Sequence, residues 1–128
     1  MAMGLVNAKI RLMNPANPEM QGIDVNALVD TGAPHLRIPE HIRLRLGLRE
    51  LEKREVILAD GRRQLCPYVG PVEIEFHARR CFVGALVLGD SVLLGAIPME
   101  DMDLVVHLAK RKLSVNPESP NIPTTLVK

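Results

Sequence analysis

A single carboxylate, Asp30, stands where an apolar run meets a turn, and Thr31 and Gly32 follow it directly. The apolar residues 27–29 predict a buried strand that delivers Asp30 into this turn. A carboxylate in such a place can take a proton from water, the hydroxyl can fasten the loop, and the glycine leaves room for a substrate or another backbone. Amide hydrolysis also needs a carboxylic acid that polarises the carbonyl, and two carboxylates sharing a proton supply both roles. The chain carries one such motif, so the second carboxylate has to come from a second copy.

Asp30 also has a purely structural interpretation, as a turn aspartate whose carboxylate accepts backbone N–H bonds. His35, just beyond the motif, either acts on the carboxylate or substrate or is an exposed loop histidine. The set Cys66, His77 and Cys81 has no usual zinc spacing, and strand alternation points neighbouring residues to opposite faces. We therefore expect no metal and no cofactor.

The elements that must position Asp30 are mostly strands. The chain has 128 residues, of which 47% are hydrophobic and 2% aromatic, so one domain with an aliphatic core is expected. Val, Leu and Ile in alternation favour an all-β fold. Residues 1–116 are expected to form this domain, and residues 117–128, which are rich in proline, an extended C-terminal tail.

Period-two alternation and turn residues predict the individual elements. Strands are expected over 6–12, 23–29, 54–59, 62–69, 72–76, 81–88, 104–107 and 112–115, and short helices over 39–46 and 98–102. Asp60 and Gly61 form the turn of a projecting hairpin, because both residues tolerate positive φ. Residues 78–80 form the turn of a second hairpin, and Gly47 is expected to end the first helix in a left-handed cap.

Charge and cysteine content exclude several function classes. Lys and Arg number 16 and Asp and Glu 15, a net charge of +1 that offers no footprint for nucleic acid. No stretch has the length and apolarity of a membrane span. Cys66 and Cys81 are not arranged as Cys-x-x-Cys and no export signal is recognisable, so we expect a cytoplasmic protein with free thiols.

The run 27–33 resembles the active-site motif of retroviral-type (retropepsin-like) aspartic proteases, and above all the small bacterial members of clan AA. Residues 92–95, an apolar run ending in Gly95, resemble the second motif of these enzymes. The hairpin at Asp60 and Gly61 occupies the place of their substrate-covering flap. The resemblance extends over approximately residues 6–115 and has the spacing of one retroviral-type protomer.

This resemblance implies a closed retropepsin-like β-barrel with one or two short helices that pairs as a homodimer. Asp30 is then the catalytic residue of an endopeptidase, and one copy from each subunit activates a shared water against a peptide or protein substrate. The other implied site residues are Thr31, Gly32 and Ala33 in the active-site loop, Pro34, His35, Asp60 and Gly61 in substrate binding, and Leu93, Leu94 and Gly95 as the structural second motif.

Two other hypotheses remain open at this point. Pro34 and the charged residues around the flap turn suggest a dimer that keeps the fold as a non-catalytic peptide-binding module. A monomer in which Asp30 is only structural is the third. Cleavage by the protein and its oligomeric state distinguish the three.

Overall fold

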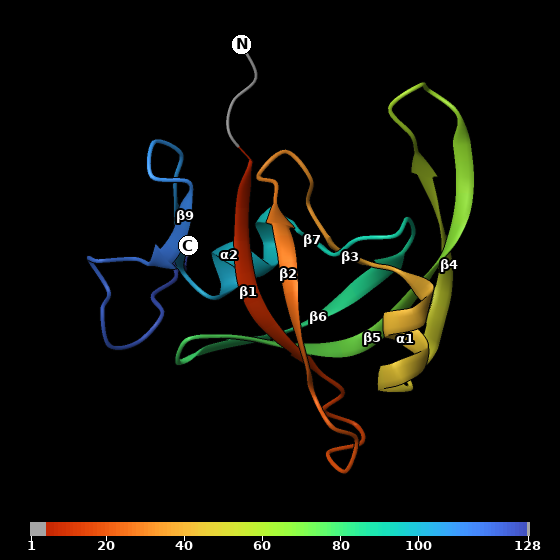
Figure 1. Cartoon of the computed structure of the whole chain (residues 1–128), viewed down its shortest axis with the longest axis horizontal. Helices are drawn as coiled ribbons and strands as arrows, with labels where there is room; N and C mark the ends of the chain where they lie inside the picture. Colours follow the sequence, from red (N-terminus) through yellow and green to blue (C-terminus); the bar gives the residue numbers. More distant parts are fainter. Residues whose placement is uncertain (1–4, 128) are drawn as a thin grey trace.

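The computed structural model describes residues 5–127, and over these residues the chain forms nine strands and two short helices (Figure 1). The strands are β1 (Val6–Met13), β2 (Ile23–Val29), β3 (Leu36–Ile38), β4 (Glu50–Ile57), β5 (Arg63–Phe76), β6 (Arg79–Val87), β7 (Leu93–Leu94), β8 (Leu104–His107) and β9 (Lys112–Val115), and the helices are α1 (Glu40–Leu46) and α2 (Ala96–Asp101).

Six of the strands close into a barrel. The sheet has the order β1-β2-β7-β3-β6-β5-β4, and an additional pairing of β1 with β5 joins its two sides. β4 extends β5 into a long hairpin that projects from the barrel (Figure 1). β8 and β9 form a separate two-stranded sheet. The expected all-β fold, a closed barrel with short helices, is confirmed.

The barrel is filled by aliphatic side chains that alternate along its strands. In β1, for example, Ile10 and Leu12 point inward and are almost fully buried, while Lys9 and Arg11 next to them face outward. Burying one such side chain contributes about 1.5–3 kcal/mol relative to leaving it exposed. The core therefore holds in place the strands that carry the site.

Some expected bounds are wrong for identifiable physical reasons. The two strands expected over 62–69 and 72–76 are one strand, β5, from Arg63 to Phe76. β4 begins at Glu50 rather than Arg54, because its exposed residues show little apolar alternation that could mark the start of the strand. β3 was not expected, and its three residues form a strand because β6 and β7 pair on either side of it. β8 and β9 have the predicted bounds.

The helices differ from expectation at their starts. Pro39 is the N-cap of α1 rather than its first residue, whereas Gly47 ends the helix in the predicted left-handed conformation, with φ of 62°. α2 begins at Ala96 rather than at Pro98. No helix within residues 5–127 has the length and apolarity needed to cross a bilayer.

Residues 116–127 contain no helix or strand but are fastened near the end of α2. The buried Arg79 guanidinium donates to the carbonyl of Met102 at 2.9 Å and to that of Ser119. The Asp103 carboxylate accepts from the Asn116 amide at 3.0 Å and from the N–H of Thr124 at 2.9 Å. Proline content did not predict these attachments.

Candidate active site

β2 delivers Asp30 to the end of a parallel ladder. β2 pairs with β7, and Leu28 N–H donates to the Val92 carbonyl at 2.9 Å. The ladder continues one step further, since Asp30 N–H donates to the Leu94 carbonyl at 3.0 Å. The backbone of Asp30 is thus fixed by the second motif predicted from the sequence.

The turn after Asp30 holds one oxygen of its carboxylate. Gly32 N–H donates to Asp30 Oδ1 at 2.9 Å, and Ala33 N–H donates to the Asp30 carbonyl at 3.3 Å. This is the backbone contact expected of a turn aspartate. An ionised carboxylate has about four acceptor positions, so one such bond leaves the group able to act on another molecule. Asp30 is partly exposed, and Thr31 and Gly32 are exposed.

Gly95 lets the second motif approach the loop after Asp30. The N–H groups of Ala96 and Ile97 donate to the carbonyls of Ala33 at 2.7 Å and Pro34 at 2.9 Å. A Cβ at Gly95 would lie 2.6 Å from the Ala33 carbonyl oxygen, so only glycine fits without displacing the backbone. These two bonds also explain why α2 begins before Pro98.

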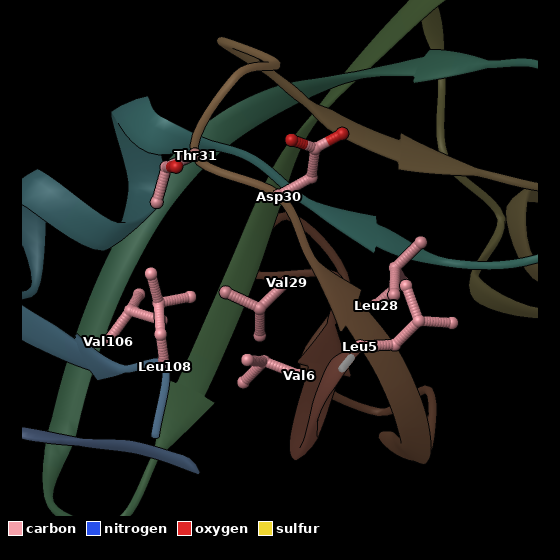
Figure 2. Close-up of a pocket in the computed structure, with 8 residues that line it drawn as sticks. All are labelled: Leu5, Val6, Leu28, Val29, Asp30, Thr31, Val106 and Leu108. Carbon is pink, nitrogen blue, oxygen red and sulfur yellow. The ribbon is translucent and has the colours of Figure 1, made fainter. Parts of the chain in front are cut away.

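A cavity of about 260 Å³ lies beside Asp30 (Figure 2). Figure 2 shows Asp30 and Leu28 on one side of β2 and Val29 and Thr31 on the other. Apart from Asp30 and Thr31 the lining is apolar, contributed by Leu5, Val6, Leu28, Val29, Val106 and Leu108. The start of β1 and the end of β8 thus surround the motif with hydrophobic side chains.

The flap turn does not line this cavity. Asp60 accepts from the N–H of Arg62 at 3.0 Å and from its guanidinium at 2.6 Å, and these bonds hold the pKa of Asp60 below its usual range. Gly61 has φ of 87°, as the predicted turn requires. The structure therefore places Asp30 and Thr31 together, and Asp60 and Gly61 apart from them at the end of the β4–β5 hairpin.

An aromatic contact between the active-site loop and the base of the flap was missed by the sequence analysis. The His35 ring lies edge-on to Tyr68 at 6.1 Å between centroids, and Arg54 Cζ lies 3.7 Å from the Tyr68 ring centroid. Partial burial, and then the positive charge of Arg54, lower the pKa of His35. Tyr68 fits because Gly84 has no Cβ, which would lie 2.1 Å from the ring. A glycine inside the apolar strand β6 was the available signal for such a close approach.

The three residues weighed as metal ligands do not form a site. Cys66 and Cys81 are buried free thiols, and His77 is exposed in the turn between β5 and β6. Within residues 5–127 no group of three or more His, Cys, Asp or Glu is arranged to hold a metal ion.

Comparison with known proteins identifies the family. A family model described as aspartyl protease matches residues 16–110, which is well over half of the chain. No curated protein matches. Among solved structures, EIAV protease complexed with the inhibitor HBY-793 is similar with a TM-score of 0.55 and 17% identity over 77% of this chain and 88% of that one. The retroviral protease-like domain of Ddi1 from Leishmania major is similar with a TM-score of 0.55 and 13% identity, over 89% of this chain and 91% of that one. The two structures show that the chain has the retropepsin-like fold, and the family match shows that the chain belongs to the aspartyl proteases.

Proposed function

We propose that the protein is an aspartic endopeptidase in which two Asp30 carboxylates, one from each subunit of a homodimer, activate a water molecule. The observation that carries this proposal is the placement of Asp30. Its backbone is fixed by the Leu94 carbonyl, and one carboxylate oxygen is held by Gly32 N–H at the edge of an apolar cavity. A rigid, partly exposed carboxylate in apolar surroundings is suited to general acid–base work.

The surface around Asp30 supports a dimer. Leu5 and Leu108 border the cavity and are 68% and 58% exposed. In an isologous contact the same patch on both copies meets at the two-fold axis, so the apolar rim would be covered and the two Asp30 side chains would face each other. The single motif of each chain then becomes half of a complete site.

The reaction needs no group beyond the carboxylate pair. The ionised Asp30 takes a proton from water while the oxygen of that water forms a bond to the peptide carbonyl carbon. The protonated Asp30 of the other copy gives its proton to the carbonyl oxygen, which yields a neutral tetrahedral diol. Proton transfer to the amide nitrogen then allows the C–N bond to break, and the second diol proton returns to the carboxylates.

The remaining predicted site residues take supporting roles in this proposal. Thr31 braces the two loops, and Gly32 and Ala33 leave the peptide backbone room beside Asp30. Pro34 and His35 contact substrate from the loop, and the hairpin turn at Asp60 and Gly61 closes over it. We place the enzyme in the cytoplasm, where its two thiols remain reduced.

Cleavage of a permanently unfolded, reduced protein at mildly acidic pH tests the proposal. We expect wild type to produce discrete fragments and Asp30→Asn to lose activity by about 10²- to 10⁴-fold, the usual contribution of a general acid–base group. Asp101→Asn, an exposed carboxylate on α2, is the matched control and keeps full activity. Equal cleavage by wild type and Asp30→Asn would overturn the proposal.

A non-catalytic peptide-binding dimer is the second candidate. It is favoured by the ion pair of Asp60 and Arg62, which gives the flap turn a charged rather than an apolar end. In this case peptides bind at the dimer axis with equal affinity to wild type and Asp30→Asn, and no peptide is hydrolysed by either.

A further inference from the structure

We propose that Tyr68 is a positioning residue, whose ring holds the active-site loop (residues 30–35) in a fixed place relative to the flap. The inference rests on the proposed function, because it assigns a residue that acts on the same site through His35. It draws on the strand pairing around Tyr68, on the contacts of its ring and on two glycines that make these contacts possible.

Tyr68 lies where the flap leaves the barrel. It pairs with Glu52 of β4 on one side and with Leu86 of β6 on the other. The ladder between β5 and β6 begins at Tyr68, whereas residues 63–67 of β5 pair with β4 in the projecting hairpin (Figure 1). A strand held on both sides yields less than one held on one side. A movement of the flap relative to the barrel therefore has its root at Tyr68.

The ring of Tyr68 contacts the flap and the active-site loop at the same time. On the flap, Arg54 Cζ lies 3.7 Å from the ring centroid, within the range of about 6 Å for a cation over an aromatic face. In the loop, the His35 ring lies edge-on at 6.1 Å between centroids, within the range of about 4.5–7 Å for aromatic pairs. Tyr68 thus joins one side chain of the flap to one side chain of the loop.

The surroundings of His35 give its ring room to move. A cavity of about 250 Å³ lies beside it, and His35, Tyr68 and Phe82 contribute the rings of its lining. Tyr68 is itself held, because Gly84 has no Cβ and the ring rests against the backbone of β6. Removal of the Tyr68 ring would therefore enlarge the space next to His35 and leave that end of the loop less constrained.

The backbone of His35 connects this contact to Asp30. A Cβ at Gly95 would lie 2.4 Å from the carbonyl oxygen of His35 and 2.7 Å from its nitrogen, so the two backbones touch with no side chain between them. The preceding residue, Leu94, accepts the hydrogen bond from Asp30 N–H at 3.0 Å. The position of the Tyr68 ring is therefore linked to that of the carboxylate through His35 and the second motif.

Ionisation of His35 makes this link dependent on pH. Partial burial, and then the charge of Arg54, lower the pKa of His35, so the ring is neutral above this pKa. The titratable groups around it are Arg54 with its partner Glu52 on β4, the phenol of Tyr68 on β5 and, two residues along the chain, Arg37. β6 and α2 present groups that do not titrate, namely Phe82, Val83, Gly84, Ile97 and Pro98. Protonation places a second cation beside the Tyr68 ring, and its repulsion by Arg54 weakens the link.

Replacement of the ring tests the assignment. Tyr68→Leu should lower kcat/KM by about 10- to 100-fold, mainly through kcat, because a displacement of about 1 Å at a catalytic group is enough for such a loss. Tyr68→Phe should restore the wild-type value, since the ring makes both contacts. Phe82→Leu removes a 59% exposed ring from the same cavity and is the matched control. A wild-type kcat/KM in Tyr68→Leu would overturn the assignment and leave the proposed protease function standing.

Two further kinetic readouts separate positioning from a loss of stability. The ratio of kcat/KM between wild type and Tyr68→Leu should decrease as the pH falls through the pKa of His35, and a ratio independent of pH would contradict the link. His35→Leu removes the same contact from the loop, and serves in place of Tyr68→Leu where circular dichroism shows that variant to be unfolded. The double variant should lose no more than the larger single loss, whereas additive losses would show that the two residues act independently.

Amide hydrogen exchange distinguishes failure of the assignment from failure of the proposed function. The N–H groups of Asp30 and Gly32 bond the Leu94 carbonyl and Asp30 Oδ1, so their exchange reports the order of the loop without any substrate. Both should exchange faster in Tyr68→Leu than in wild type, Tyr68→Phe and Phe82→Leu. This result supports the assignment even when no peptide is hydrolysed, and unchanged exchange in Tyr68→Leu rejects it.

Discussion

Gly95 and His35 are in such close backbone contact that a Cβ at Gly95 would lie 2.4 Å from the His35 carbonyl oxygen. Gly95→Ala should therefore force the active-site loop away from β7 and lower the free energy of unfolding by about 1–3 kcal/mol. Chemical denaturation measures this loss. Gly22→Ala is a matched control, because the added methyl there meets only the flexible side chains of Met13 and Arg11. An equal free energy of unfolding for Gly95→Ala and Gly22→Ala would show that the active-site loop can move away from β7 without loss of stability.

Leu108 is expected to contribute to self-association, since it is exposed beside the Asp30 cavity. Leu108→Glu would place a charge in the proposed two-fold contact, where like charges from both copies meet. Sedimentation at micromolar concentration should show a shift towards monomer, accompanied by loss of cleavage. Leu44→Glu changes a leucine of similar exposure, 66%, on α1 outside the cavity, and should affect neither. A monomer shift in both variants would argue against a specific interface.

Asp103 should stabilise the attached tail only while it is ionised. Its pKa is lowered to about 2, chiefly by hydrogen bonds from the side chains of Ser119 and Asn116 and from the N–H of Thr124. A lowered pKa in the folded state gives stability that is present above the ordinary value near pH 4 and is lost as pH falls towards 2. The thermal midpoint of Asp103→Asn should thus lie below that of wild type at pH 6 and approach it near pH 2. A gap that persists undiminished at pH 2 would contradict this account, and Asp101→Asn provides the control.

The cysteines are expected to be unreactive in the folded protein. Burial, and then the negative charge of Asp101, raise the pKa of Cys81 to about 12, and burial also raises the pKa of Cys66. The thiolate is the reactive form, so little of it exists at pH 8. A colorimetric thiol reagent at that pH should react slowly with the native protein. After addition of guanidinium chloride it should react rapidly with both cysteines. Rapid reaction of the native protein would show that the barrel opens readily.

Local sequence patterns predicted the elements whose residues alternate against the core. β2, β8 and β9 have the predicted bounds, and β1 differs only at its end. In β1 and β2 one face is apolar and period two is visible, whereas β8 is a short apolar run whose four residues are all half-buried. The position of Asp30 at the end of β2 followed from the same pattern. The hydrogen bond from Asp30 N–H to the Leu94 carbonyl depends on a pairing between distant segments, which a local sequence pattern does not show.

The arginines show where sequence reasoning stops. Arg37 between Leu36 and Ile38 carried the signal of a strand with one polar face, but three residues are too few to distinguish it from a loop. Its lack of a carboxylate partner is visible only when the barrel is assembled. Arg79 likewise looked like part of a turn, whereas it is buried and binds carbonyls from α2 and the tail.

The hydrogen bond between Asp30 N–H and the Leu94 carbonyl also determines when, during folding, the backbone of Asp30 can take its final position. During synthesis β2 emerges long before β7, and the loop between them must close before the ladder can form. Contacts of high sequence separation form slowly in folding. The backbone of Asp30 therefore lacks this hydrogen bond until β7 has been synthesised and has paired with β2.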